Sequence, residues 1–173
     1  MTAFFSEALG KHDRSAFTSS NERIDDYFRQ AISQDVKRGY AASYVLVEKA
    51  SAKIAGFYTL SSHSIPLTEL PAETTRKLPR CPSVPAVLIG WLDRDASFRG
   101  QHIGAMLLAD VITRLAAAPV GIHALCADAI DDAAAAFYRE YQFQLFSSRP
   151  HSFFLPTKTA LALVAQRTGK DSS

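Results

Sequence analysis

A short polar turn, Arg99-Gly-Gln-His-Ile-Gly-Ala105, stands between an apolar strand pattern and an apolar helix pattern. The first backbone N–H groups of a helix have no intrahelical acceptors, and the helix dipole adds partial positive charge there. Gly100 and Gly104 allow a ligand to approach the backbone closely. Such a turn is typical of a phosphate site, although glycines at helix starts also serve as ordinary turns. The spacing alone leaves both interpretations open.

The elements around this turn predict an alternating α/β chain. An amphipathic helix is expected from Asn21 to Arg38, opened by a capping box at Ser19 and Glu22, and the residues through Ser20 are expected to be irregular. The other predicted elements are strands at 43–48, 54–60, 84–92, 122–127, 143–146 and 153–155, and helices at about 73–78, from 103 to before Pro119, at 131–140 and at 157–166. They are expected to form one mixed sheet flanked by helices.

The composition narrows the class of protein. The chain has 173 residues, of which 47% are hydrophobic and 21% charged, and its net charge is +2. These values predict a single globular domain over residues 1–173 and differ from those of a dedicated nucleic-acid-binding protein. With no apolar run of about 20 residues and no basic secretory start, a cytoplasmic protein without membrane contact is expected. Two cysteines and five scattered histidines predict no metal site.

A second pattern follows further along the chain, in Asp131-Asp-Ala-Ala-Ala-Ala-Phe-Tyr-Arg-Glu-Tyr-Gln-Phe143. Its spacing predicts a helix capped by Asp131 or Asp132. Together with the turn at residues 99–105, this segment resembles the GNAT acetyltransferase superfamily. Arg99 and Gly104 match the family's pyrophosphate loop, written Arg/Gln-x-x-Gly-x-Gly/Ala. The later helix matches through the residues Phe137, Tyr138 and Phe143.

Two positions depart from the superfamily pattern. His102 stands where the first loop glycine is usual, and Gln142 replaces the glycine before Phe143. The His102 side chain is able to crowd a pyrophosphate or, if protonated, to donate a hydrogen bond to it. We expect the cofactor to bind with His102 in place.

The chain resembles one branch more closely: the GNAT toxins of bacterial toxin–antitoxin modules, which acetylate aminoacyl-tRNA. The most distinctive shared stretch is Arg76-Lys-Leu-Pro-Arg80, followed soon by Val84-Pro-Ala86, because ordinary GNAT enzymes lack it. The resemblance extends over most of the chain. The other shared stretches are His12-Asp-Arg14 with Phe17, residues 24–30, residues 34–38, residues 54–61, residues 128–138 and Phe154-Leu-Pro156.

The resemblance implies a site for acetyl-CoA. The cofactor would lie along the strand that ends at Leu92, with Tyr138 near the thioester sulfur. A phenol, with a pKa of about 10, can donate a proton to a leaving thiolate, whereas an α-amino group with a pKa of about 7.7–8.0 needs no strong base. Tyr138 is thus the candidate general acid, and a half-buried helix aromatic is the alternative. The implied cofactor residues are Leu92, Asp93, Arg94, Arg99, Gly100, Gln101, His102, Ile103, Gly104, Ala105, Asp131 and Phe137.

The basic residues are unevenly spread. Residues 76–114 contain six basic and three acidic residues, whereas the first 75 residues contain eight basic and nine acidic ones. Phosphate contacts supply most of the non-specific affinity for RNA, although most surface charges simply remain solvated. The family motif favours RNA contact for Arg76, Lys77 and Arg80, supported by Arg29, Lys37 and Arg38.

Three functions remain open. The first is an acetyltransferase toxin acting on aminoacyl-tRNA, with a ribbon-helix-helix antitoxin and a homodimer implied by the resemblance. The second is a GNAT enzyme for a small-molecule or protein amine. The third is a non-catalytic GNAT binding module. The departures at His102 and Gln142 favour this function, whereas the presence of Arg99 and Tyr138 argues against it. Trp91, where these toxins commonly have a basic or smaller residue, is expected to be a core residue rather than a wall of the acceptor pocket.

Overall fold

The computed structural model describes residues 3–78 and 81–170. The chain divides into two compact units, Met1–Ser61 with Gly90–Val111 and Ser62–Ile89 with Ile112–Ser173. Seven strands of the described residues form a sheet in the order β1-β2-β3-β4-β5-β7-β6. The β1–β2, β2–β3, β5–β7 and β6–β7 pairings are antiparallel, and β4 pairs with β5 in parallel. The predicted mixed sheet flanked by helices is confirmed, and most of these pairings are antiparallel.

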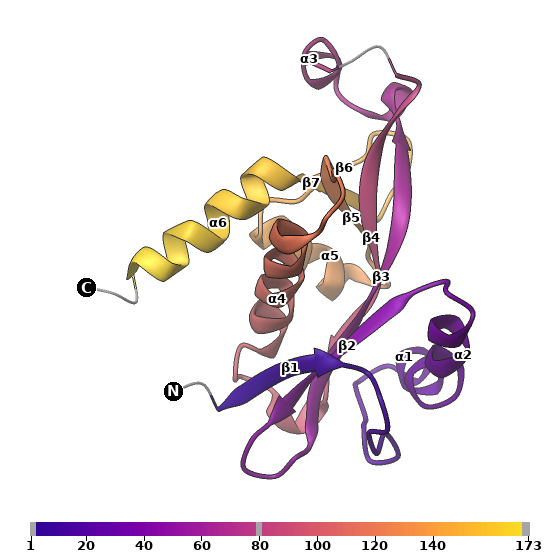
Figure 1. The fold of residues 1–173 in the computed structure, drawn as a ribbon, viewed down its shortest axis with the longest axis vertical. Helices are drawn as coiled ribbons and strands as arrows, with labels where there is room; N and C mark the ends of the chain where they lie inside the picture. The colour runs from indigo at the N-terminus through magenta and orange to yellow at the C-terminus, as the bar shows by residue number, and fades with distance from the viewer. Residues whose placement is uncertain (1–2, 79–80, 171–173) are drawn as a thin grey trace. The chain divides into compact units, whose positions relative to one another are not determined.

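The first unit begins with a strand that the sequence did not predict. β1 (Phe4–Ala8) pairs with β2 (Ala42–Glu48), and β2 pairs with the first part of β3 (Ile54–Pro66), as Figure 1 shows. The expectation of irregular structure through Ser20 is therefore wrong for β1. Only Phe4 of this strand is buried, so no alternating apolar pattern marks it, and its partner strand follows the first helix in the chain.

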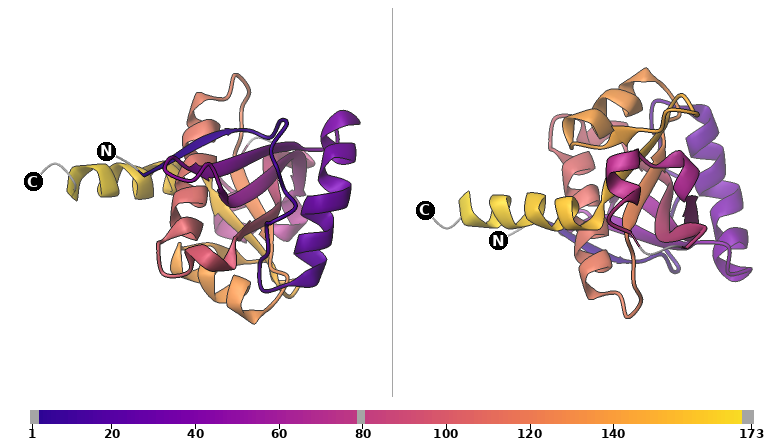
Figure 2. Two further views of the ribbon diagram at one scale, coloured as in Figure 1. Left: turned by 90° about the horizontal axis from the view of Figure 1, so that it is seen from below. Right: turned by 90° about the horizontal axis from the view of Figure 1, so that it is seen from above.

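The first predicted helix is present but is not uniform. It consists of α1 (Glu22–Asp26), a π-helical turn η1 (Tyr27–Ala31) and α2 (Ile32–Lys37), which Figure 2 shows end to end as one helix. At the end of the π turn, the Ile32 N–H donates to the carbonyl of Tyr27, five residues earlier. Such turns interrupt a regular helix and are frequent at functional sites.

The predicted capping box is wrong. Asn21 is the N-cap of α1, and its side chain accepts from the backbone N–H of Arg23 at 3.0 Å. Ser19 exchanges hydrogen bonds with the backbone of Asn21 instead, and no Glu22 side-chain bond completes a box among the described residues. At the other end, Gly39 has φ +74° and stops the helix as expected.

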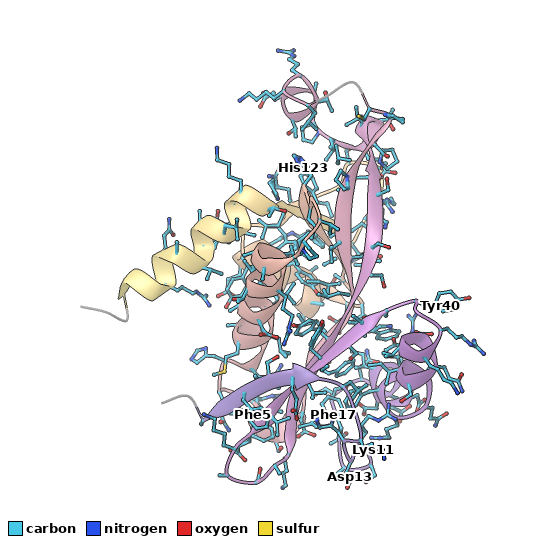
Figure 3. The ribbon with its side chains drawn as sticks, viewed as in Figure 1. Phe5, Lys11, Asp13, Phe17, Tyr40 and His123 are labelled. Atoms are coloured by element: carbon cyan, nitrogen blue, oxygen red, sulfur yellow. The ribbon has the colours of Figure 1, made fainter. Side chains whose placement is uncertain are left out.

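An aromatic core holds this helix to the strands of the first unit. The ring of Phe28 stacks on that of Phe57 at 4.1 Å, and Phe17, labelled in Figure 3, contacts both rings. All three side chains are buried. Burial of large rings of this kind supplies much of the stability of a small core.

The second unit contains the other end of the sheet. The parallel pairing of β4 (Ser83–Arg94) with β5 (Ala124–Asp128) covers Ala86–Ile89, and β7 (Ser152–Pro156) pairs with β5 and with β6 (Gln144–Leu145). The helices of this unit are η2 (Leu67–Glu69), α3 (Ala72–Thr75), α5 (Asp132–Glu140) and α6 (Thr157–Lys170). Of the remaining helices, η3 (Ala96–Phe98) lies in the first unit, and α4 (Ile103–Ala117) runs from the first into the second.

The stretch between β3 and β4 is more ordered than predicted. β3 continues to Pro66 rather than ending at Leu60, and α3 ends at Thr75, short of the expected helix around 73–78. In Figure 1, α3 lies beyond the ends of these two strands. Leu70 is buried in the core of the second unit, so this segment is anchored there.

Candidate functional site

The candidate phosphate loop is anchored by Asp95, a residue that the sequence analysis missed. Asp95 is 6% exposed; its carboxylate accepts from the N–H groups of Ser97 at 2.9 Å and Thr18 at 3.0 Å. The adjacent Phe98 is buried and contacts the ring of Phe4 edge-on at 5.9 Å. An Asp two residues before a Ser is a known turn signal and would have identified this anchor.

The loop itself has the geometry that a phosphate requires. Gly100 has φ +81°, and the Met106 N–H donates to the His102 carbonyl at 3.1 Å, which closes the first turn of α4. The N–H groups of residues 103–105 precede that bond, and helix geometry gives them no intrahelical acceptor. Residues 99–102 are exposed, whereas Ile103 is buried and fixes the helix start. The loop therefore fits an anionic group.

His102 has a backbone conformation that explains the glycine usual at its position. Its φ is +59°, in the left-handed region that glycine adopts without cost. Gln142, the second departure from the pattern, has φ +67° just after α5. Both residues keep the local backbone that a glycine would adopt, so the substitutions change side chains without removing the turns.

A glycine in β3 sets the distance between the sheet and the start of α4. A Cβ on Gly56 would stand 2.8 Å from Leu107 Cδ1, 2.9 Å from Ile103 Cγ2 and 3.0 Å from the Asp93 carbonyl oxygen. Only glycine permits this close approach. Gly56 therefore positions the first turn of α4 against β3 within the first unit.

The end of β4 supplies the next predicted residues. The parallel ladder with β5 ends at Ile89, and β4 continues through Leu92 and Asp93 to Arg94. These three side chains are half-buried, and the Arg94 N–H donates to the Asp93 carboxylate at 2.8 Å.

In the second unit, α5 carries the remaining candidates. Asp131 is the N-cap of this helix, as expected, and its carboxylate accepts from the Ala134 N–H at 2.8 Å. Tyr138 is 4% exposed, and its ring lies 5.1 Å from that of Phe143 and 6.1 Å from that of Phe153. Phe137 contacts it edge-on at 5.4 Å. These rings hold the Tyr138 side chain in one position.

The candidate RNA contacts differ in how free their charges are. Arg76 and Lys77 follow α3 and are exposed, as are Lys37 and Arg38 at the end of α2. Arg80 lies outside the described residues. Arg29 instead donates to the Phe17 carbonyl, with Nη2 at 2.6 Å and Nε at 3.2 Å, and lies 3.8 Å from Asp25. Its guanidinium thus also supports the fold.

Trp91 is neither a fully buried core residue nor an open one. It packs half-buried against the aromatic core of the first unit, and its ring stacks on Tyr27 at 4.2 Å with an interplanar angle of 11°. The expectation of a core residue is met only in part.

The predicted residues divide between the two units. The first unit contains residues 92–105, Arg29, Lys37 and Arg38, and the second contains Arg76, Lys77, Asp131, Phe137 and Tyr138. Among the described residues, no group of three or more His, Cys, Asp or Glu side chains is placed to hold a metal ion. In the same part of the chain, no helix has the length and apolar character to cross a membrane.

The sheet, with a phosphate-type loop at the start of a helix, defines the GNAT class of acetyltransferases, and solved structures agree. A mutant of KacT matches at 27% identity and TM-score 0.85, covering 94% of this chain and 99% of its own. AtaT complexed with acetyl-methionyl-tRNAfMet matches at 26% identity and TM-score 0.83, and the match covers 92% of this chain and 98% of AtaT. AtaTR bound with acetyl-CoA matches at 26% identity and TM-score 0.80, and the match covers 94% of this chain and 99% of the matched chain.

Sequence comparison narrows the class. No protein-family model matches the chain. A probable toxin TacT of Sinorhizobium fredii is 32% identical over 163 residues, which are 89% of this chain and 90% of the relative. A tRNA-acetylating toxin of Mycobacterium tuberculosis is 32% identical over 155 residues, 88% of this chain and 90% of the relative. The chain belongs to this family of GNAT acetyltransferase toxins.

Proposed function

We propose that this protein is an acetyl-CoA-dependent N-acetyltransferase toxin that acetylates the α-amino group of aminoacyl-tRNA and so inhibits translation. The observation that carries the proposal is the loop at residues 99–105, with an exposed helix start and left-handed φ values at Gly100 and His102. Support comes from a relative named as a tRNA-acetylating toxin and from a structural neighbour complexed with an acetylated aminoacyl-tRNA.

The loop is the proposed anchor for the cofactor. The pyrophosphate would be held by the N–H groups of residues 103–105, which carry the partial positive charge of the helix start. It would also accept hydrogen bonds from the cationic guanidinium of Arg99. Leu92, Asp93 and Arg94 at the end of β4 would lie along the pantetheine, and Asp131 and Phe137 would complete the cofactor site. When bound, acetyl-CoA supplies the activated thioester.

Tyr138 is the proposed general acid. Its phenol would donate a proton to the sulfur that leaves as the amine attacks the thioester carbonyl. The nitrogen would lose a proton to solvent as the amide forms, and the phenolate would regain one from solvent. The α-amino group, with a pKa of about 7.7–8.0, is substantially neutral near pH 8, so no carboxylate base is required. The aromatic contacts of Tyr138 give a phenylalanine the same packing, which makes Tyr138→Phe a clean test.

The deciding experiment is incubation with acetyl-CoA and a pool of charged tRNAs, read by mass spectrometry of the aminoacyl ends. We expect acetylated aminoacyl-tRNA from the wild type and a loss of about 10²-fold or more in kcat for Tyr138→Phe. Acetyl-CoA affinity should stay unchanged in this variant, and a cooperative thermal melt would show that it is folded. A fully active Tyr138→Phe would exclude the general acid, and acetylation only of small or protein amines would exclude the tRNA substrate.

The same proposal includes the partners. A toxin of this family is expected to be neutralised by an antitoxin, for which the resemblance implies a ribbon-helix-helix protein, and to act as a homodimer made of single-domain GNAT chains in the cytoplasm. Light scattering of the purified chain tests the dimer directly.

A further inference from the structure

Arg23 is an exposed arginine on the first turn of α1, and nothing in the function proposed above uses it. Its guanidinium carbon lies 5.7 Å from the centre of the Trp91 ring, within the range of a cation–π contact. Among the residues that the structure describes, its side chain makes no ion pair or hydrogen bond. Its charge is therefore held in place yet available to a ligand.

The support beneath Arg23 is rigid. The backbone N–H of Trp91 donates to Thr59 Oγ1 at 3.1 Å, and Thr59 is 1% exposed. On the other side, the Tyr27 ring stacks on Trp91, and its hydroxyl donates to Asp35 at 3.0 Å. Burial and the neighbouring Asp35 raise the pKa of Tyr27, so its phenol stays neutral and keeps donating. Arg23 thus rests on an indole whose backbone is bonded to a buried threonine and whose ring is stacked on a hydrogen-bonded tyrosine.

Two other arginines near this helix, Arg14 and Arg29, are committed to the fold. Arg29 donates to the Phe17 carbonyl and lies near Asp25, and Arg14 donates to the Phe28 carbonyl at 2.8 Å. An arginine whose donors already satisfy buried carbonyls gains little by turning to a ligand, because those carbonyls would be left unpaired. Of Arg14, Arg23 and Arg29, only Arg23 has its donors free.

We propose that Arg23, positioned by Trp91, is an RNA contact that binds a phosphate of the tRNA substrate. The inference rests on the proposed function. Trp91 directly precedes Leu92, where the resemblance places the cofactor, so a phosphate bound at Arg23 belongs near the acceptor end of the RNA. Arginine suits this role because its planar fork both stacks on an indole and pairs with phosphate oxygens. Trp91 stands where these toxins commonly have a basic or smaller residue, and it carries no charge itself. Its ring instead holds the charge of Arg23, which lies on α1.

The test measures binding of uncharged tRNA, without acetyl-CoA, over about 50–200 mM salt. We expect Arg23→Ala to weaken tRNA binding about fivefold. The slope of log K for binding against log salt concentration should become shallower by about 1, the share of one phosphate contact. Arg23→Lys should keep the slope but bind less tightly, since lysine lacks the fork. Trp91→Leu should also keep the slope while raising Kd. Lys53→Ala, which removes an exposed charge from the β2–β3 turn of the same unit, is the matched control.

Several outcomes would overturn the inference. If Arg23→Ala matches Lys53→Ala in both Kd and slope, Arg23 contacts no phosphate of the RNA. If calorimetry shows that Arg23→Ala weakens acetyl-CoA instead, the phosphate belongs to the cofactor. A wild type that binds no tRNA excludes both proposals, whereas one that binds tRNA through Arg23 and fails to acetylate it overturns only the proposed function.

Discussion

At the scale of single residues, the departures from the family pattern keep the backbone and change the side chain. His102 and Gln142 occupy left-handed conformations at the two places where glycine is usual. Each substitution costs about 1 kcal/mol of strain that glycine would avoid, partly offset by the smaller chain entropy of a non-glycine residue. Both turns therefore keep the backbone shape of a glycine, at some expense of stability.

This predicts that His102→Gly stabilises the protein by about 0.5–1 kcal/mol, measured by urea unfolding. His102→Ala is the control, because it removes the imidazole but keeps the strained φ, and it should give no gain. Acetyl-CoA should bind both the wild type and His102→Gly in calorimetry. A wild type that binds no acetyl-CoA until His102 is replaced by glycine would contradict the expectation that the cofactor binds with His102 in place.

A buried thiol makes stability depend on pH. Cys126 is 2% exposed, and its pKa is raised to about 12, first by burial and then by the charge of Asp128. The thiol in the unfolded chain titrates near 9, so the folded state favours the neutral form. Its contribution to stability is complete below pH 9 and is lost as the pH rises from 9 toward 12.

Above pH 9, the free energy of unfolding should therefore fall about 1.4 kcal/mol per pH unit more steeply in the wild type than in Cys126→Ala. Urea unfolding from pH 8 to 10.5 measures this difference. Cys81→Ala, which removes an exposed thiol, should leave the slope of the wild type unchanged. Equal slopes for the wild type and Cys126→Ala would refute the prediction.

At the scale of elements, the start of α4 depends on a strand that precedes it by about forty residues in the chain. Gly56 in β3 leaves room for Leu107 and Ile103, so β3 sets how closely the first turn of α4 approaches. The loop at residues 99–105 ends in this turn, and its other end is held by Asp95. The proposed phosphate site at the loop thus depends on the packing between β3 and α4.

We expect Gly56→Ala to destabilise the protein by about 1–3 kcal/mol through overpacking and to weaken acetyl-CoA binding by shifting the helix start. Thermal melts and calorimetry measure the two effects. Gly10→Ala is the matched control, since a Cβ there meets nothing within 4 Å, and it should change neither. Loss of stability with unchanged acetyl-CoA affinity would show that the cofactor does not depend on this turn.

At the scale of the whole molecule, a net charge of +2 is compatible with RNA binding only if a few cations are free. The exposed candidates lie in both units, with Lys37 and Arg38 in the first and Arg76 and Lys77 in the second. A small set of contacts of this kind gives moderate, salt-dependent affinity and leaves the tRNA able to dissociate.

Replacement of Arg76 and Lys77 by alanine should raise the KM for charged tRNA. The slope of log K for tRNA binding against log salt concentration should become shallower by about 2, the share of two phosphate contacts. Acetyl-CoA affinity should stay the same, since neither residue is among the proposed cofactor contacts. Lys158→Ala, an exposed charge of α6, controls for a change in net charge. A parallel loss of tRNA and acetyl-CoA binding would instead indicate misfolding.

The sequence by itself determined most of the elements and the candidate site, because local patterns encode them: the apolar strand, the polar turn and the helix that follow one another at residues 84–117, and the Asp131 cap. The tertiary structure alone decided the strand β1, the π turn and the use of each arginine. β1 exists through pairing with β2, and Arg29 differs from Arg23 only in which carbonyls and rings surround it. Contacts between distant parts of the chain leave no local signal, so these features required the fold.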